Sequence, residues 1–350
     1  MLIYLFLISE ILILNYFSKN KTLSRKNFCI IIGVSFILIT GLRSANVGSD
    51  TTGYYLSFYD LANVSLSDAI FEKREIAYYV LAWIVQRTTN SFTVLTLLAA
   101  AAFYVPIMKL IEKYSPDPGL SCLVLMAFNF FQFSMTGIRQ TISMGFAVLF
   151  FMELFDEKPK TLKMLTFLIL SILFHRSSLV VLLFFLVKPL SKNKNIPVIL
   201  SLLIPIMFIF RKPFITSLQG FFDYIGFGDI ELTATYGGMS TFLVYLLLVF
   251  IGLFFIKEKE KSQGAPFILM MIVGTIFQTW VFEDAIFFRI AWYFSIFMII
   301  YIPRIIEESS LIDRQKFILN LGIYACVLFM YLFITKGSAT VLPYEFFWQG

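Results

Sequence analysis

The sequence predicts an all-α, polytopic integral membrane protein. Its 350 residues are 59% hydrophobic and only 14% charged, against about 25% charged in an ordinary soluble domain. Apolar runs follow one another along nearly the whole chain, and a membrane helix needs roughly 20 such residues. We therefore expect a single polytopic membrane domain over residues 1–350, with about 12 transmembrane helices and no separate soluble domain.

The first apolar run, residues 1–17, sets the predicted orientation. No basic residue precedes it, and Lys19, Lys21, Arg25 and Lys26 follow it without an acid, which is the reverse of a cleavable signal peptide. Because Lys and Arg collect in cytoplasmic loops, we expect this helix to be retained with its N-terminus outside. The further predicted spans are residues 28–42, 92–112, 120–136, 138–155, 196–210, 241–256, 267–282, 286–302 and 317–335.

Residues 164–187 form an apolar stretch that one ordinary span does not explain. His175 and Arg176 lie at its middle, and lysine-rich loops flank it on both sides. If both flanks are cytoplasmic, the stretch enters and leaves on the same side, as two short helices or as a re-entrant hairpin lining a wet cavity. The total is then about 12 helices, or about 10 plus a hairpin, with both termini outside.

Two larger loops fall on the outer face in this topology, residues 43 to about 91 and residues 211–240. Residues 75–86 within the first loop are apolar but too short to span, so we expect a helix at the outer interface. Lys predominates among the cytoplasmic basic residues, whereas Arg predominates outside, against the usual bias. Because Arg holds phosphate bidentately, the outer arginines predict an anionic ligand: Arg43, Arg74, Arg87, Arg139, Arg176, Arg211 and Arg289. For Arg74, Arg87 and Arg211, snorkelling or pairing with outer acids explains the charge equally well.

Several functional classes are disfavoured. The net charge of +6 reflects membrane orientation, so we expect no nucleic-acid partner. The cysteines, Cys29, Cys122 and Cys326, lie far apart in apolar runs without metal-ligand spacing, so we expect neither a disulfide nor zinc. The chain has no P-loop, no GxGxxG and no GxSxG. No cofactor is predicted.

Short polar motifs recur in order along the chain, each at a predicted outer helix end. Residues 43–54 (RSANVGSDTTGY) resemble the R-x-x-x-V-G-x-D-x-x-x-Y opening of the EpsG family of polysaccharide-polymerising membrane proteins. Ala77 stands where this family usually has Gly, while Tyr78 is in place. The other matching elements are EIAY at 75–78, GIRQ at 137–140, FHRS at 174–177, RIAWYF at 289–294 and PY at 343–344.

The resemblance implies a Wzy-type polymerase of O-antigen or capsular polysaccharide in the bacterial inner membrane. Such an enzyme works at the periplasmic face on oligosaccharides carried by undecaprenyl diphosphate, within the lipid bilayer. It transfers the growing glycan from its lipid carrier to the non-reducing end of a new repeat unit. The resemblance also implies a chain-length regulator as partner.

The outer cations suit a glycosyl diphosphate donor, whose leaving group departs with negative charge. Arg43, Arg139, Arg176 and Arg289 are the candidate diphosphate ligands. The alternative is a Mg²⁺ ion held by Asp50 and the Glu283–Asp284 pair. The candidate sugar-binding residues are Tyr54, Tyr78, Gln140 and Tyr293, although membrane anchoring explains tyrosines equally well.

The acceptor hydroxyl needs a general base within hydrogen-bond reach. His175, Asp50 and Glu75 are the candidates, and the sequence does not rank them. A histidine accepts a proton near neutral pH, but His175 also fits a structural role inside the bundle. Asp50 and Glu75 fit equally as ion-pair partners of Arg43 or Arg74.

Two other functions share the predicted architecture. A lipid-linked glycan flippase or transporter needs cationic groups near the midplane and commonly shows repeat symmetry, whereas these motifs lie at outer helix ends. A membrane acyltransferase with one intramembrane histidine would favour a cytoplasmic site, against the outward position predicted for His175.

Overall fold

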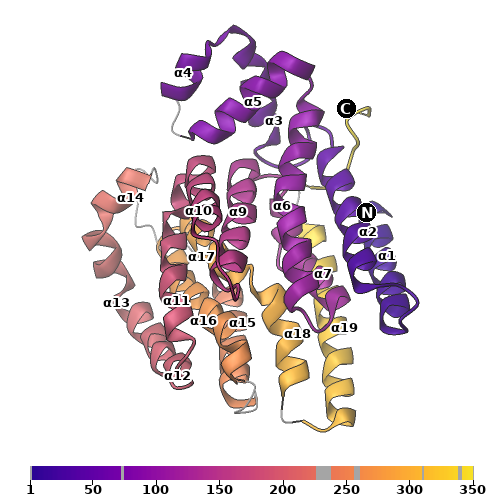
Figure 1. Cartoon of the computed structure of the whole chain (residues 1–350), viewed down its shortest axis with the longest axis vertical. Helices are drawn as coiled ribbons and strands as arrows, with labels where there is room; N and C mark the ends of the chain where they lie inside the picture. Colours follow the sequence, from indigo (N-terminus) through magenta and orange to yellow (C-terminus); the bar gives the residue numbers. More distant parts are fainter. Residues whose placement is uncertain are drawn as a thin grey trace. The chain divides into compact units, whose positions relative to one another are not determined.

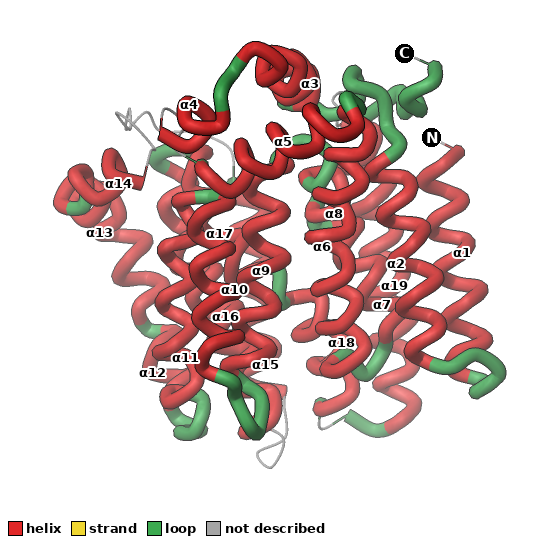
Figure 2. The backbone as a smooth tube through the Cα atoms, turned by 45° about the horizontal axis from the view of Figure 1, so that its top comes forward, coloured by secondary structure: helices red, strands yellow, loops and turns green. Residues whose placement is uncertain are grey.

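The computed structural model describes residues 2–71, 75–225, 238–255, 261–309, 311–337 and 341–349. These residues form helices joined by loops, without a β-strand (Figures 1 and 2). The predicted all-helical class is confirmed. Arg74 and part of the predicted outer loop 211–240 lie outside the described residues.

The chain divides into two compact units. Unit 1 comprises Met1–Glu153, Lys158–His175 and Leu321–Gly350, and unit 2 comprises Leu154–Glu157 and Arg176–Asn320. The single membrane domain over residues 1–350 stays a prediction.

Unit 1 contains the first half of the helices and most of the last one. Helix α2 packs along α6, and α5 contacts α10. Helices α3, α4 and α5 lie across the ends of α6, α9 and α10 (Figures 1 and 2). The elements are α1 (Leu2–Lys19), α2 (Arg25–Gly41), α3 (Thr51–Asp60), η1 (Leu61–Asn63), α4 (Leu66–Phe71), α5 (Ile76–Thr89), α6 (Phe92–Tyr114), α7 (Pro118–Ala127), α8 (Phe130–Phe133), α9 (Ile138–Leu154), α10 (Thr161–Phe174) and α19 (Asp313–Gly337).

Unit 2 is built around α16, which packs against α15, α17 and α18. Its elements are η2 (Arg176–Leu183), α11 (Phe184–Leu190), α12 (Ile196–Ser201), α13 (Leu203–Ser217), α14 (Gln219–Ile225), α15 (Met239–Phe255), α16 (Lys261–Gln278), η3 (Thr279–Phe282), η4 (Ala285–Phe287), α17 (Phe288–Ser295) and α18 (Met298–Glu308).

Four helices in the described part of the chain are long and apolar enough to cross a membrane. They are Leu2–Lys19, Phe92–Tyr114, Ile196–Ser217 and Gly264–Phe282, and α17 with α18 adds a fifth if this pair, bent by 45°, is one span. Each remaining predicted span coincides with a helix, but several are short: α2 and α9 have 17 residues and α10 has 14. The count of about 12 spans stays a prediction.

The helix over residues 164–187 is interrupted at His175 and Arg176, the polar residues at which the sequence predicts a break. Helix α10 ends at Phe174, and His175 has an extended backbone with φ −158° and ψ 118°. The chain then continues as η2 and α11. The apolar segment 75–86 is helical, as α5.

A cluster of apolar side chains joins α3 and α5 of unit 1 to α6, α9 and α10. It includes Phe58 of α3, Tyr78 of α5, Phe92 of α6, Ile142 of α9 and Phe174 of α10, all at most 8% exposed. Burial of such side chains is worth about 1.5–3 kcal/mol each. This cluster therefore fixes α3, α5, α9 and α10 to one another.

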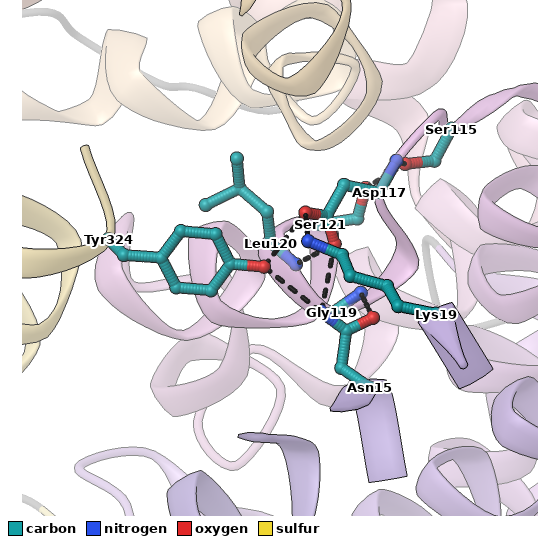
Figure 3. Close-up of polar contacts among 8 residues, drawn as sticks. All are labelled: Asn15, Lys19, Ser115, Asp117, Gly119, Leu120, Ser121 and Tyr324. Atoms are coloured by element: carbon teal, nitrogen blue, oxygen red, sulfur yellow. Dashed lines mark hydrogen bonds and ion pairs between the residues drawn. The ribbon is translucent and has the colours of Figure 1, made fainter. Parts of the chain in front are cut away.

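A buried carboxylate ties three helices of unit 1 together (Figure 3). Asp117 caps α7 by accepting from the Leu120 backbone N–H at 3.1 Å. The same carboxylate accepts hydrogen bonds from Asn15 of α1 at 3.1 Å, Lys19 of α1 at 2.7 Å and Tyr324 of α19 at 2.9 Å. Both carboxylate oxygens therefore have partners from more than one helix.

Replacing Asp117 with alanine is expected to destabilise unit 1 by about 2–4 kcal/mol, because it removes a helix cap and leaves buried donors unpaired. The thermal unfolding midpoint of the purified protein in detergent should fall. The exposed Asp60, at the end of α3, supplies the matched control Asp60→Ala. Equal midpoints for the two variants would contradict a stabilising role for the Asp117 network.

The C-terminal segment 341–349 binds the ends of α1 and α2. Tyr4 donates to the carbonyl of Val341 at 2.8 Å. The Ser44 N–H donates to the Glu345 carbonyl at 2.8 Å, and the Phe347 N–H donates to the Leu42 carbonyl at 2.9 Å. This segment, hereafter the C-terminal strap, thus contacts the start of the loop that follows α2.

Candidate active site

The carboxylate of Glu75 joins His175 and Arg139 within unit 1. Its Oε1 contacts Nδ1 of His175, and its Oε2 forms an ion pair with Nη1 of Arg139. The side chains are 9%, 14% and 33% exposed for Glu75, His175 and Arg139 respectively. Only the arginine therefore has substantial access to solvent.

Helix ends supply all three residues. Glu75 is the N-cap of α5, but its side chain makes no capping hydrogen bond, so the carboxylate is available to other groups. Arg139 is the second residue of α9. His175 is the C-cap of α10, and its backbone N–H donates to the Ser171 carbonyl at 3.1 Å.

Tyr54 of α3 covers the arginine. Nε of Arg139 donates to Tyr54 Oη at 3.2 Å, and the guanidinium carbon lies 5.4 Å from the Tyr54 ring centre. The Tyr54 ring packs edge-on against that of Tyr78, with centroids 5.6 Å apart. Burial raises the pKa of Tyr54 more than the nearby Arg139 lowers it. The phenol therefore keeps its proton and can donate it to a ligand.

The surroundings of Glu75 hold its carboxyl group as an anion. Burial raises the pKa of Glu75, while the hydrogen bond and charge of His175 and the charge of Arg139 lower it by more. The net pKa lies below the ordinary glutamate value. The anionic carboxylate is thus an acceptor for both His175 and Arg139.

The geometry leaves one nitrogen of His175 unused. In the neutral imidazole, the contact of Nδ1 with the carboxylate favours the tautomer that has its hydrogen on Nδ1 and its lone pair on Nε2. Nε2 is buried and has no hydrogen-bond partner among the described residues. A buried polar atom left without a partner costs about 1–3 kcal/mol, so Nε2 is suited to accept a hydrogen bond from a bound ligand.

A family model described as the EpsG family matches residues 26–346, nearly the whole chain. The chain belongs to the EpsG family. Comparison with curated proteins and with solved structures finds no match. Together with its apolar helices, the family makes the chain a multi-pass membrane protein of a Wzy-type polymerase-like family.

The site draws one residue from each of four EpsG-family elements. Tyr54 closes the first element, Glu75 opens the second, and Arg139 and His175 lie in the third and fourth. Sequence reasoning selected all four residues, and it gave an ion pair of Glu75 with Arg43 or Arg74 as the alternative to its role as a base. Its described partners are instead Arg139 and His175.

Asp50 of the first EpsG-family element makes a local contact in the described residues. It is exposed at the N-cap of α3, where it accepts a hydrogen bond from Ser49 at 3.2 Å. None of the contacts described for Asp50 reaches His175. Its predicted role as a base stays a prediction.

Arg43 is buried, at 3% exposure. Its guanidinium donates to the backbone carbonyls of Thr40 and Met135, the latter at 2.9 Å. The adjacent Gly48 has φ +102°, and a Cβ there would lie 2.4 Å from the Met135 carbonyl oxygen. The V-G element therefore packs the loop between α2 and α3 against the segment before α9, and Arg43 supports that packing.

The remaining predicted ligands of this EpsG-family chain are divided between the units. In unit 1, Gln140 and Tyr78 are buried, each at 3% exposure. In unit 2, Arg176 and Arg289 are half-buried, and Tyr293 is 1% exposed. Their predicted roles in binding diphosphate and sugar stay predictions.

Glu283, an acid of the alternative metal site, is ion-paired within unit 2. Its carboxylate lies 2.8 Å from Nε of Arg211, whose guanidinium is 4.9 Å from the Phe208 ring centre and 5.8 Å from that of Phe282. Asp284 accepts from the Ile286 N–H at 2.8 Å. The described residues contain no group of three or more His, Cys, Asp or Glu that could hold a metal.

Proposed function

We propose that this protein polymerises lipid-linked oligosaccharide repeat units into O-antigen or capsular polysaccharide. It transfers the growing glycan from undecaprenyl diphosphate to the non-reducing end of a new repeat unit, at the periplasmic face of the bacterial inner membrane. Membership of the EpsG family supports the polymerase class. The proposed topology has about 12 spans with both termini periplasmic, and the proposed partner is a chain-length regulator.

The observation that carries this proposal is the environment of His175. Nδ1 is engaged by an anionic carboxylate, while Nε2 is buried and unpartnered among the described residues. This arrangement is that of a general base, which needs a fixed tautomer and a free lone pair. Among the three candidate bases, the geometry favours His175, with Glu75 as the residue that positions it.

The proposed reaction starts with a hydroxyl of the acceptor sugar donating a hydrogen bond to Nε2. As this oxygen bonds to the anomeric carbon of the donor, its proton moves to Nε2. The bond from the anomeric carbon to the diphosphate breaks, and its electron pair leaves with the diphosphate. Glu75 stabilises the imidazolium that forms, and the proton returns to solvent afterwards.

The cations have separate proposed roles. Arg139 holds Glu75 in place and shares its charge with that carboxylate, so its remaining N–H groups are available to the donor sugar or diphosphate. Arg43 supports the first outer loop through the carbonyls of Thr40 and Met135. Arg176 and Arg289 remain the proposed diphosphate ligands, because Arg pairs bidentately with phosphate.

Deleting the gene tests the function against the flippase alternative. A strain without the polymerase should display surface glycan of one repeat unit and lack the ladder of longer chains, because units are still assembled and exported. A gel of surface glycan gives the result directly. Loss of the single-unit product as well would contradict polymerisation and support lipid-linked glycan transport.

A further inference from the structure

Two buried serines, Ser143 of α9 and Ser171 of α10, bond reciprocally across the helix interface. Oγ of Ser143 donates to the Ser171 carbonyl at 2.8 Å, and Oγ of Ser171 donates to the Ser143 carbonyl at 3.0 Å. The two hydroxyl oxygens are 3.1 Å apart, and both residues are 0% exposed. We call this pair the serine clasp.

Serines within helices commonly bond to carbonyls of their own helix. In the serine clasp, each hydroxyl donates to a backbone carbonyl of the neighbouring helix. The next turn of each helix adds a stacked pair, Phe146 on Phe174, with centroids 5.5 Å apart and planes 15° apart. The interface is therefore held in one register by both polar and aromatic contacts.

The clasp lies one helical turn from the candidate active site on both helices. Ser143 follows Arg139 by four residues on α9, and Ser171 precedes His175 by four residues on α10. The Ser171 carbonyl that accepts from Ser143 also accepts the His175 backbone N–H at 3.1 Å. One carbonyl thus connects the serine clasp directly to the backbone of the histidine.

We propose that Ser143 and Ser171 are positioning residues that hold His175 and Arg139 at the spacing Glu75 bridges. This inference rests on the proposed function of His175 as general base. A slip or rotation of α10 against α9 would move the two partners of Glu75 apart, and a displacement of about 1 Å at a catalytic group can cost about a hundredfold in rate. The clasp prevents that movement without touching substrate.

The test compares two variants of α9 in the full-length protein, assayed for polymerisation of purified lipid-linked repeat units. Ser143→Ala removes one bond between the helices. Thr141→Val is the matched control: Thr141 is also buried on the same helix, and among the described residues its hydroxyl bonds to carbonyls of its own helix and its N-cap, those of Gly137 and Ile138, at 3.2 and 3.0 Å. Unfolding midpoint and membrane level are measured for both.

Ser143→Ala should lose about tenfold to a hundredfold in kcat with little change in KM, while Thr141→Val stays near the parent. Ser171→Ala should show the same loss, and the double variant should lose about as much as either single one, because the serines act as a unit. Near-parent kcat for both single variants, or a loss matched by Thr141→Val, would overturn the positioning role. His175→Asn separates the two ideas, since a His175→Asn protein with nearly the parent's rate overturns the role of His175 as general base, whereas a loss in His175→Asn with near-parent kcat in both serine variants overturns only the positioning role.

Discussion

Replacing His175 with asparagine is expected to reduce the polymerisation rate by about a hundredfold to ten-thousandfold, the usual contribution of a general base. The asparagine amide can take the place of Nδ1 in the contact with Glu75, so the local packing is largely retained. The variant lacks only the position of Nε2, which is buried and unpartnered among the described residues. The measurement is the initial rate of chain growth on purified lipid-linked repeat units. A His175→Asn protein with nearly the parent's rate would rule out His175 as the base.

Replacing Glu75 with glutamine should reduce the polymerisation rate nearly as much as His175→Asn does. A neutral amide can donate to Nδ1 of His175, which favours the tautomer with its hydrogen on Nε2 and so blocks proton acceptance. The change also leaves Arg139 without its ion-pair partner. We expect a fall in kcat of about a hundredfold or more, measured with the membrane level matched to the parent.

Glu153 provides a matched control for Glu75. Both glutamates are 7% exposed and ion-paired in unit 1. Glu153 lies 2.6 Å from Lys163 Nζ, and it accepts from the Lys160 N–H at 2.8 Å. Glu153→Gln should lower the unfolding midpoint and leave kcat near that of the parent. If the two glutamine variants had equal activity, Glu75 would be a structural ion pair only.

Much of the fold follows from the distribution of apolar residues. Composition alone predicts the helical class, and each predicted span coincides with a described helix or pair of helices. The polar pair at His175 and Arg176 predicts the interruption of residues 164–187, because two such groups are costly inside an apolar helix. Backbone breaks of local origin are harder to predict. Asn129, which has φ +67°, separates α7 from α8 inside an apolar run.

The candidate site was predicted in its residues but not in its connections. Glu75, Arg139 and His175 each stand in a polar motif, which is why sequence reasoning selected them. Their pairing depends on tertiary packing, since Glu75 and His175 are 100 positions apart. Charge alone suggested Arg43 or Arg74 as the partner of Glu75. The structure instead buries Arg43 against backbone carbonyls. The C-terminal strap lies close by, and no local sequence pattern predicts its position.

The C-terminal strap also constrains the membrane topology of the chain. Tyr4 bonds to Val341, and Ser44 bonds to Glu345, so the start of α1, the end of α2 and the strap meet at one end of unit 1. Between Tyr4 and Val341 the chain must therefore cross the membrane an even number of times. Met135, which binds both Arg43 and Thr51, places the segment leading into α9 at this same end. A reporter enzyme fused near either end of the chain should thus give the same answer, and that answer identifies the membrane face to which this end of unit 1 belongs.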